Sequence, residues 1–375
     1  MKKYESAYRR GEVQILSFVA AFFVIALSLI LTVPDEVRVF SDQTESLHLP
    51  FKEVTIRVLP ETRVIPGGQS VGVMMDVKGV LVVGLEEITD RSGAAINPGL
   101  LAGLEIGDSI LSIDGTAVDS AADVQSVLNH LKKDRVRLQI SRKGKKKEIM
   151  IQPVCAKEDG LYKIGVWVRD RTAGLGTMTF YNPENGSFGA LGHAITEPSS
   201  GELLSLREGT LLHTRVESVR QGKTGEPGEI RGIFYEADAP WGTLNKNTEY
   251  GIFGTLKEAA SNPYYPEPIS VGYREDVTEG PAYLLTTLDG NRVQKFEIEI
   301  EQVRRQQKMN TKSMVLRVTD KVLLKKTGGI VQGMSGSPII QNGKLVGAVT
   351  HVFVNDPKRG YGVLIQWMLQ KSMEE

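Results

Sequence analysis

The stretch GGIVQGMSGSPIIQNGKLVGAVTHVFV, residues 328–354, places Ser335 between Gly333 and Gly336, with a Ser-Pro pair directly behind. Glycines strip side chains from the backbone and let it approach another molecule closely. Further on, Asn342-Gly343 separates two apolar runs, and this dipeptide favours the type I′ turn of a β-hairpin. The stretch therefore predicts a β-hairpin with Ser335 on the loop before it.

The chain around this loop has the pattern of a β domain. From about Leu161 to the C-terminus, short apolar runs alternate with Gly, Asn and Pro, and long amphipathic helices are scarce. Such spacing is typical of a barrel or sandwich. We therefore assign residues 161–375 to one mainly β domain.

The segment GMSGSP is similar to the G-x-S-G-x-P element of chymotrypsin-like serine peptidases. With this spacing the N–H groups of Gly333 and Ser335 can converge on one point, where the oxyanion of a tetrahedral intermediate would lie. A serine hydroxyl is a weak nucleophile until a base takes its proton. The element thus predicts Ser335 as nucleophile and a base elsewhere in the chain.

The chain has five histidines, so elimination can select the base. His193 stands in FGALGHAIT, where small residues leave an imidazole open to a cleft, and it is the predicted base. The other four histidines have simpler roles. We place His48 in the stalk near the membrane, His130 at the end of a helix, and His213 and His351 on strands.

Spacing does not identify the acid that would orient the imidazole. Asp320 is one candidate, and the others are Asp238, Asp289 and Asp356. A Ser-Lys dyad is an alternative mechanism, with three lysines near the serine as its candidates: Lys321, Lys325 and Lys326.

Residues 67–155 resemble a PDZ domain of the bacterial protease-associated kind. The resemblance rests on GLEIGD (103–108), on IDG (113–115) and on a helix expected over 121–131. Such domains present backbone N–H groups to a peptide that adds a strand beside them. The expected peptide-binding loop is Gly68, Gln69, Ser70, Val71, Gly72 and Val73. Its sequence departs from the usual aromatic-ended loop.

The N-terminus predicts a retained membrane anchor. Ile15 to Val33 carries no charge and, as a helix, would span roughly 28 Å, close to a hydrocarbon core. Basic residues precede it and acidic residues follow, which favours a cytoplasmic N-terminus. We therefore expect a tail and anchor over residues 1–36 and a stalk over residues 37–66, with the bulk of the chain outside the cytoplasm.

Composition excludes several other classes. Lys+Arg and Asp+Glu both number 45, which gives no electrostatic argument for nucleic acid. Cys155 is the one cysteine, so the chain has no internal disulfide and no cysteine metal site. The common metal and nucleotide motifs are missing. We expect no metal and no cofactor.

The residues around both catalytic candidates, together with the order of anchor, PDZ domain and peptidase, resemble the SpoIVB family of stage IV sporulation serine peptidases. The resemblance implies a chymotrypsin-like β-barrel with the triad His193, Asp320 and Ser335. It also implies a signalling role at the inner forespore membrane, with the bulk of the chain in the intermembrane space. The resemblance implies that members of the family cleave themselves there, which can release them from the membrane. They also cleave a regulatory subunit of an intramembrane metalloprotease that matures a late sigma factor.

A rival interpretation is a catalytically silent scaffold whose PDZ domain binds membrane partners. Retention of a glycine-flanked serine, an isolated histidine and a nearby acid argues for the endopeptidase instead.

Overall fold

The computed structural model describes residues 36–39, 46–49, 52–58, 62–198, 201–235, 240–304 and 308–374. The chain divides into two compact units, Met1–Thr62 and Arg63–Glu375. The expected anchor, Ile15 to Val33, lies outside the described residues. Among the residues that are described, no helix is long and apolar enough to cross a membrane.

The first unit contains a three-stranded sheet formed by β1 (Glu36–Val39), β2 (Ser46–Leu49) and β3 (Lys52–Val58). The central strand β3 pairs in parallel with β1 and antiparallel with β2. The sequence analysis assigns these residues to the stalk, apart from Glu36, which it places at the end of the anchor.

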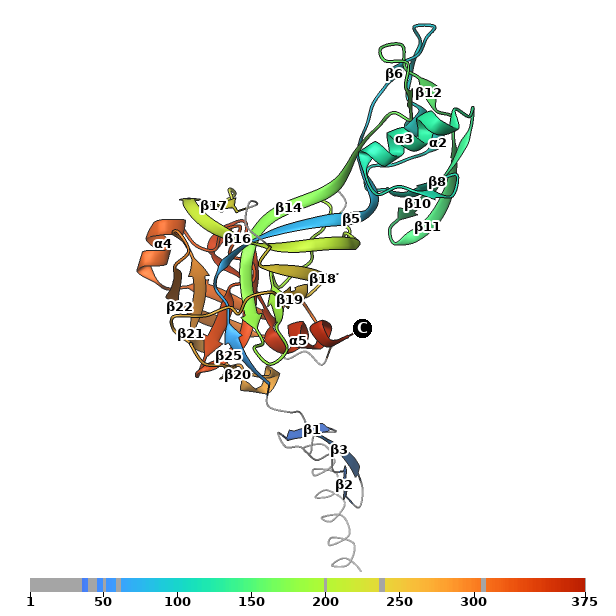
Figure 1. Cartoon of the computed structure of the whole chain (residues 1–375). Coiled ribbons are helices and arrows are strands. Elements are labelled where there is room, and N and C mark those ends of the chain that lie inside the picture. The colour runs from blue at the N-terminus through green and yellow to red at the C-terminus, as the bar shows by residue number, and fades with distance from the viewer. Residues whose placement is uncertain are drawn as a thin grey trace, which may run out of the picture. The chain divides into compact units, whose positions relative to one another are not determined.

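The second unit is mainly β and contains a PDZ-type lobe and a β-barrel (Figure 1). The PDZ-type lobe begins within β5 and continues to β13. Its elements are β5 (Ser70–Leu85), β6 (Ile88–Thr89), β7 (Ala95–Ile96), α2 (Pro98–Ala102), β8 (Ser109–Ile113), β9 (Thr116–Ala117), α3 (Ala121–Leu131), β10 (Val136–Arg142), β11 (Lys145–Ile151), β12 (Val154–Cys155) and β13 (Tyr162–Lys163).

The helix α3 confirms the sequence pattern. Its N-cap Ser120 accepts the N–H of Asp123 at 3.0 Å, and Val124 and Leu128 are buried on its inner face. An uncapped helix start leaves backbone donors without partners, and a serine there stabilises the helix by about 1 kcal/mol. Val80, Val82, Ile110 and other apolar residues complete the core of the lobe.

Strand β5 is long, since Ser70–Leu85 forms one strand of 16 residues. Its first part pairs with β14 and β16 of the C-terminal β part, and its last part pairs with β8 and β14. Gly79, whose φ is +76°, lies where the partners change, because the pairs with β16 end at Val77 and those with β8 begin at Val80.

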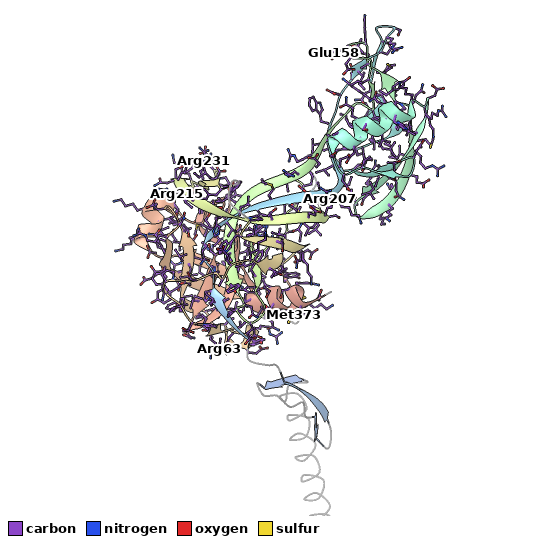
Figure 2. The ribbon with its side chains drawn as sticks, in the orientation of Figure 1. Arg63, Glu158, Arg207, Arg215, Arg231 and Met373 are labelled. Atoms are coloured by element: carbon purple, nitrogen blue, oxygen red, sulfur yellow. The ribbon has the colours of Figure 1, made fainter. Side chains whose placement is uncertain are left out.

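The C-terminal β part combines strands of a large sheet with a closed barrel. The sheet strands are β4 (Arg63–Pro66), β14 (Val166–Tyr181), β15 (Ser187–Ala190), β16 (Leu206–Arg220), β17 (Glu229–Phe234), β18 (Gly242–Thr248), β19 (Gly251–Leu256) and β20 (Ile269–Ser270). Figure 2 shows Arg207 near the start of β16, where its guanidinium pairs with Asp76 at 3.1 Å and with Asp119 at 3.8 Å.

The closed barrel has the strand order β21-β22-β23-β26-β25-β24. The remaining elements are the 3₁₀ helix η1 (Arg274–Asp276), β21 (Gly280–Thr287), β22 (Val293–Val303), β23 (Met314–Val318), α4 (Lys321–Thr327), β24 (Pro338–Gln341), β25 (Lys344–Phe353), β26 (Asp356–Leu364) and α5 (Ile365–Met373). Asn342 and Gly343, with φ of 51° and 76°, form the predicted turn between β24 and β25. Buried aliphatic residues such as Leu284, Ile300 and Ile339 fill the barrel.

Candidate active site

The loop that carries Ser335 joins α4 to β24 and is anchored in the barrel. Met334 is fully buried, while Ser335 is only partly buried. The Gly336 N–H donates to the Val349 carbonyl at 2.8 Å, and the Ser337 N–H donates to the Met334 carbonyl at 2.9 Å. The loop is therefore held on both sides of the serine.

Gly336, the residue after the serine, is a glycine because the backbone of two neighbouring segments lies very close to it. A methyl group at Gly336 would lie 2.1 Å from the Thr177 carbonyl oxygen and 2.4 Å from the Leu191 backbone nitrogen. Its φ of +92° also favours glycine. Leu191 lies two residues before His193, so this contact brings the serine loop against the segment that leads to the histidine.

The geometry of Gly333 fits an oxyanion site. Its φ is +94°, and among the described residues neither its N–H nor that of Ser335 donates to a protein acceptor. Two free backbone donors in one tight turn can bind a developing negative charge. A side chain at Gly333 would meet Ile230 and Leu175 at 3.0 Å and would shift these donors.

The neighbouring strand β14 holds this turn. The Thr177 hydroxyl donates to the Gly333 carbonyl at 2.8 Å, and the Thr177 N–H donates to the Ser335 carbonyl at 2.9 Å. The Thr179 hydroxyl donates to the Gly336 carbonyl at 2.8 Å. Both threonines are buried. The sequence analysis missed them, and only their alternate positions on one strand hint that they share a face.

His193 follows β15 at a sharp turn of the chain. Leu191 and Gly192 both have positive φ, 68° and 69°, which directs the histidine toward the pocket. Its Nδ1 lies 2.7 Å from the Ala194 carbonyl oxygen. A carbonyl only accepts, so Nδ1 carries the proton and Nε2 keeps its lone pair. Burial lowers the pKa of His193, which favours the neutral imidazole that a general base needs.

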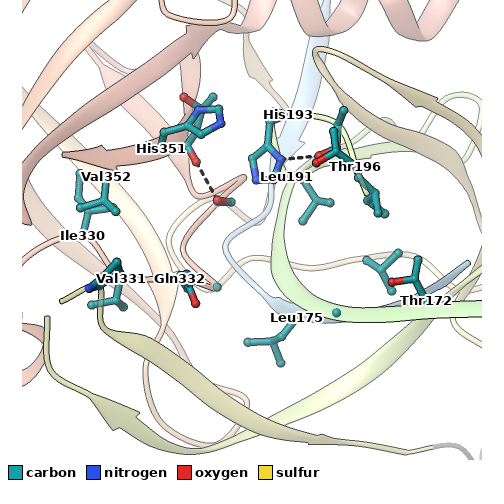
Figure 3. Close-up of a pocket in the computed structure, with 18 of the residues that line it drawn as sticks. Thr172, Leu175, Leu191, His193, Thr196, Ile330, Val331, Gln332, His351 and Val352 are labelled. Carbon is teal, nitrogen blue, oxygen red and sulfur yellow. Dashed lines mark hydrogen bonds between the residues drawn. The ribbon is translucent and has the colours of Figure 1, made fainter. Parts of the chain in front are cut away.

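His351 is a second histidine at the site, and the sequence analysis gave it a structural role on its strand. Its ring centroid lies 5.1 Å from that of His193 (Figure 3). Desolvation, His193 and Lys312 lower the pKa of His351 to about 4. The pair is therefore neutral near pH 7.

His193, Gly333 and Ser335 line one pocket of about 490 Å³, together with His351. Within it the Ser335 hydroxyl donates to the Thr350 carbonyl at 2.8 Å. Most of the remaining wall is apolar or backbone, and includes Leu175, Leu191, Ile330, Val331 and Val352, as Figure 3 shows. The structure thus brings the predicted nucleophile, base and oxyanion donors to the same cavity.

The structure does not bring Asp320 to His193. Asp320 is the N-cap of α4, where one carboxylate oxygen accepts the N–H groups of Val322 at 2.8 Å and Leu323 at 2.9 Å. In this structure the Ala194 carbonyl oxygen, rather than a carboxylate, lies beside Nδ1 of His193, so the assignment of Asp320 as the triad acid stays a prediction. Asp289 and Asp356 do not line the pocket, and Asp238 lies outside the described residues.

The other candidates also lie elsewhere. The three lysines of the alternative dyad are on α4, and none lines the pocket. His213 stacks on Trp241, with ring centroids 4.4 Å apart. His130 is exposed on α3, and the side chain of His48 lies outside the described residues.

The predicted peptide-binding loop is wrong. These residues lie at the start of β5 or just before it, where the strand pairs within the C-terminal β part: Gly68, Gln69, Ser70, Val71, Gly72 and Val73. Val71 and Val73 are buried, and the strand pairs with β14 on one side and β16 on the other. No edge is left there for a peptide to join.

The site combines a serine, a neutral imidazole and a glycine-containing turn whose two N–H donors have no protein acceptor in the part of the chain that the structure describes. Together these groups define a serine hydrolase site on a mainly β fold. Residues 160–369 match the SpoIVB peptidase S55 family, and residues 75–152 match the PDZ domain family. The chain belongs to the SpoIVB peptidase S55 family and is a serine peptidase with a PDZ domain.

Other comparisons cover less of the chain. A Lactococcus lactis protein whose name describes it as a zinc metalloprotease is 30% identical over 111 residues, which are 28% of this chain and 26% of that protein. The chain thus spans about a quarter of that relative's length. Crystal structures of the Rv3671c protease from M. tuberculosis are similar at 15% identity and cover 53% of this chain. The active form, 72% covered, has a TM-score of 0.32, and the inactive form, 85% covered, has a TM-score of 0.31.

Proposed function

We propose that the chain is a serine endopeptidase in which Ser335 is the nucleophile and His193 the general base. The main support for this proposal is that Ser335, His193 and Gly333 line the same pocket. The Gly333 and Ser335 N–H groups have no protein acceptor among the described residues, so they can bind an oxyanion. A chymotrypsin-like arrangement fits this, since His193 comes from the large sheet and Ser335 from the closed barrel.

The mechanism follows from the hydrogen bonds. Ser335 first turns its hydroxyl from the Thr350 carbonyl toward the lone pair on His193 Nε2, which accepts the proton as the oxygen attacks the peptide carbonyl. The Gly333 and Ser335 N–H groups stabilise the oxyanion. His193 then gives the proton to the leaving amine, and a water molecule repeats the sequence to release the acyl group.

The substrates proposed here are proteins. The family resemblance suggests that the chain cleaves itself and a regulatory subunit of an intramembrane metalloprotease during sporulation. It also suggests a single-pass anchor in the inner forespore membrane, with the bulk of the chain in the intermembrane space and release after self-cleavage.

The family resemblance also proposes Asp320 as the acid, and one substitution separates this from its role in capping α4. Asparagine caps a helix about as well as aspartate, so Asp320→Asn leaves the helix stable while removing the charge. A fall of about ten-thousandfold in turnover supports the acid. Unchanged turnover assigns Asp320 to the cap alone.

Labelling with a fluorophosphonate probe tests the peptidase itself. The probe should modify Ser335 in the wild-type chain but label neither Ser335→Ala nor, at a comparable rate, His193→Ala. A matched control is Ser337→Ala, which removes a hydroxyl from the same loop. No labelling of the folded wild-type chain would instead support the catalytically silent scaffold.

A further inference from the structure

The free edge expected of a PDZ domain is occupied here by the chain itself. A peptide normally joins such a domain as an extra strand beside its sheet. The last part of β5 pairs with β8 on one side, where Val80 faces Ile110. On the other side it pairs antiparallel with β14, where Val82 faces Val168 and Leu85 faces Val166.

Helix α3 holds the same segment along its length. The Asn129 side chain accepts the Tyr162 N–H at 2.8 Å and donates to the Tyr162 carbonyl at 3.4 Å. At the other end of the helix, the Ala121 N–H donates to the Asp170 carboxylate at 3.3 Å. The stretch 162–170 therefore lies between a strand and a helix, as a bound peptide would.

The side chains of this stretch alternate as those of a bound strand do. Ile164 is 2% exposed and belongs to the apolar core of the lobe, and Val166 and Val168 pack against that core. Between them, Trp167 is 60% exposed and Arg169 is also exposed. Three successive residues of the inner face, Ile164, Val166 and Val168, are thus β-branched, and Tyr162 before them also packs against this core.

We propose that the groove between β5 and α3 is the peptide-binding site of the lobe and that residues 162–170 are its resident ligand. The ligand class is an extended internal segment with β-branched residues at alternate positions. The residues in the groove are internal to the chain, so a free carboxylate is not required. An external segment binds only by displacing the resident one.

Tethering makes the resident ligand a strong competitor. A segment joined to its site by a short connection acts at an effective concentration on the order of millimolar. An external peptide with the same contacts therefore needs about that concentration to occupy half of the sites. Weakening the resident segment, without touching the groove, should open the site.

The experiment uses a fluorescent synthetic peptide of residues 160–171 and the full chain carrying Ser335→Ala, so that no cleavage intervenes. Val168→Asn removes an inward apolar contact of the resident segment, and Arg169→Asn is the matched outward control. Fluorescence anisotropy should show binding to Val168→Asn at least tenfold tighter than to Arg169→Asn or to the parent chain.

Equal binding to the inward and outward variants overturns the proposal, as does absence of binding to Val168→Asn. Val166→Asn repeats the test at an independent position should Val168→Asn fail to fold. The readout is binding rather than turnover, so it stands whether or not Ser335 is the nucleophile.

Discussion

Thr177 offers the sharpest test of how the oxyanion turn is held. Thr177→Val keeps the shape of the side chain and removes the hydroxyl that donates to the Gly333 carbonyl at 2.8 Å. That carbonyl has no other hydrogen-bond donor among the described residues. This bond is partly buried, so leaving the acceptor without a protein donor costs about 1–2 kcal/mol, in the lower part of the range for unsatisfied buried groups. The hydrogen bond from the Thr177 N–H to the Ser335 carbonyl remains in the variant and limits the displacement of the turn.

The expected effect on turnover follows from this cost. If about 1–2 kcal/mol is lost from the arrangement that binds the oxyanion, kcat falls roughly 5–30-fold. The effect should be smaller than deletion of a donor itself, which costs about 100–1,000-fold. KM should change little, because the hydroxyl does not face the bound substrate but the Gly333 carbonyl.

The assay compares ester hydrolysis and chemical denaturation for three variants. Thr177→Ser keeps the hydroxyl and should keep the rate. Thr179→Val removes the equivalent bond to the Gly336 carbonyl, which belongs to neither of the two residues that supply the oxyanion donors, so it should cost similar stability but less kcat. Equal rates for the two valine variants, or an unchanged rate in Thr177→Val, would refute the reasoning.

Three further predictions concern pH, packing and the helix cap. Because the pKa of His351 is lowered to about 4 from an ordinary 6.5, the unfolded chain binds this proton first as pH falls. Stability should therefore drop between about pH 6.5 and 4, and urea unfolding should show a shallower drop for His351→Gln than for the wild type. Gly336→Ala should abolish fluorophosphonate labelling, since its methyl group would overlap the Thr177 carbonyl; labelling within tenfold of wild type would contradict the packing argument. Asp320→Ala should destabilise the chain by about 1 kcal/mol by uncapping α4, and Asp320→Asn should not, as measured by denaturation.

The sequence predicted those parts of the site that depend on neighbours in the chain. The spacing of Gly333, Ser335 and Gly336 indicates the turn, and the small residues before His193 indicate its presentation. Thr177 could not be found this way, because its role arises from a contact 156 residues away. The position of an acid is equally non-local, and Asp320 shows that a carboxylate near a serine in sequence can serve a helix end instead.

The PDZ groove was misplaced for a related reason. An apolar run such as residues 70–85 can form a domain's edge strand or a strand paired on both sides, and its composition does not separate the two. Here the partners β14 and β16 come from far along the chain, and they decide the outcome.

Strands β5 and β14 run together from the pair Thr177–Ser70 beside the serine loop to the pair Val166–Leu85 in the PDZ-type lobe. The exposed connection at residues 157–160 is thus a covalent link between parts that are already joined by a ladder of backbone hydrogen bonds. A chain nicked there would give two bands on a denaturing gel and still migrate as one body in its native state. The boundary between the two family matches is therefore not a boundary between separate structural units. Neither half could be excised without leaving one of its strands paired in the other.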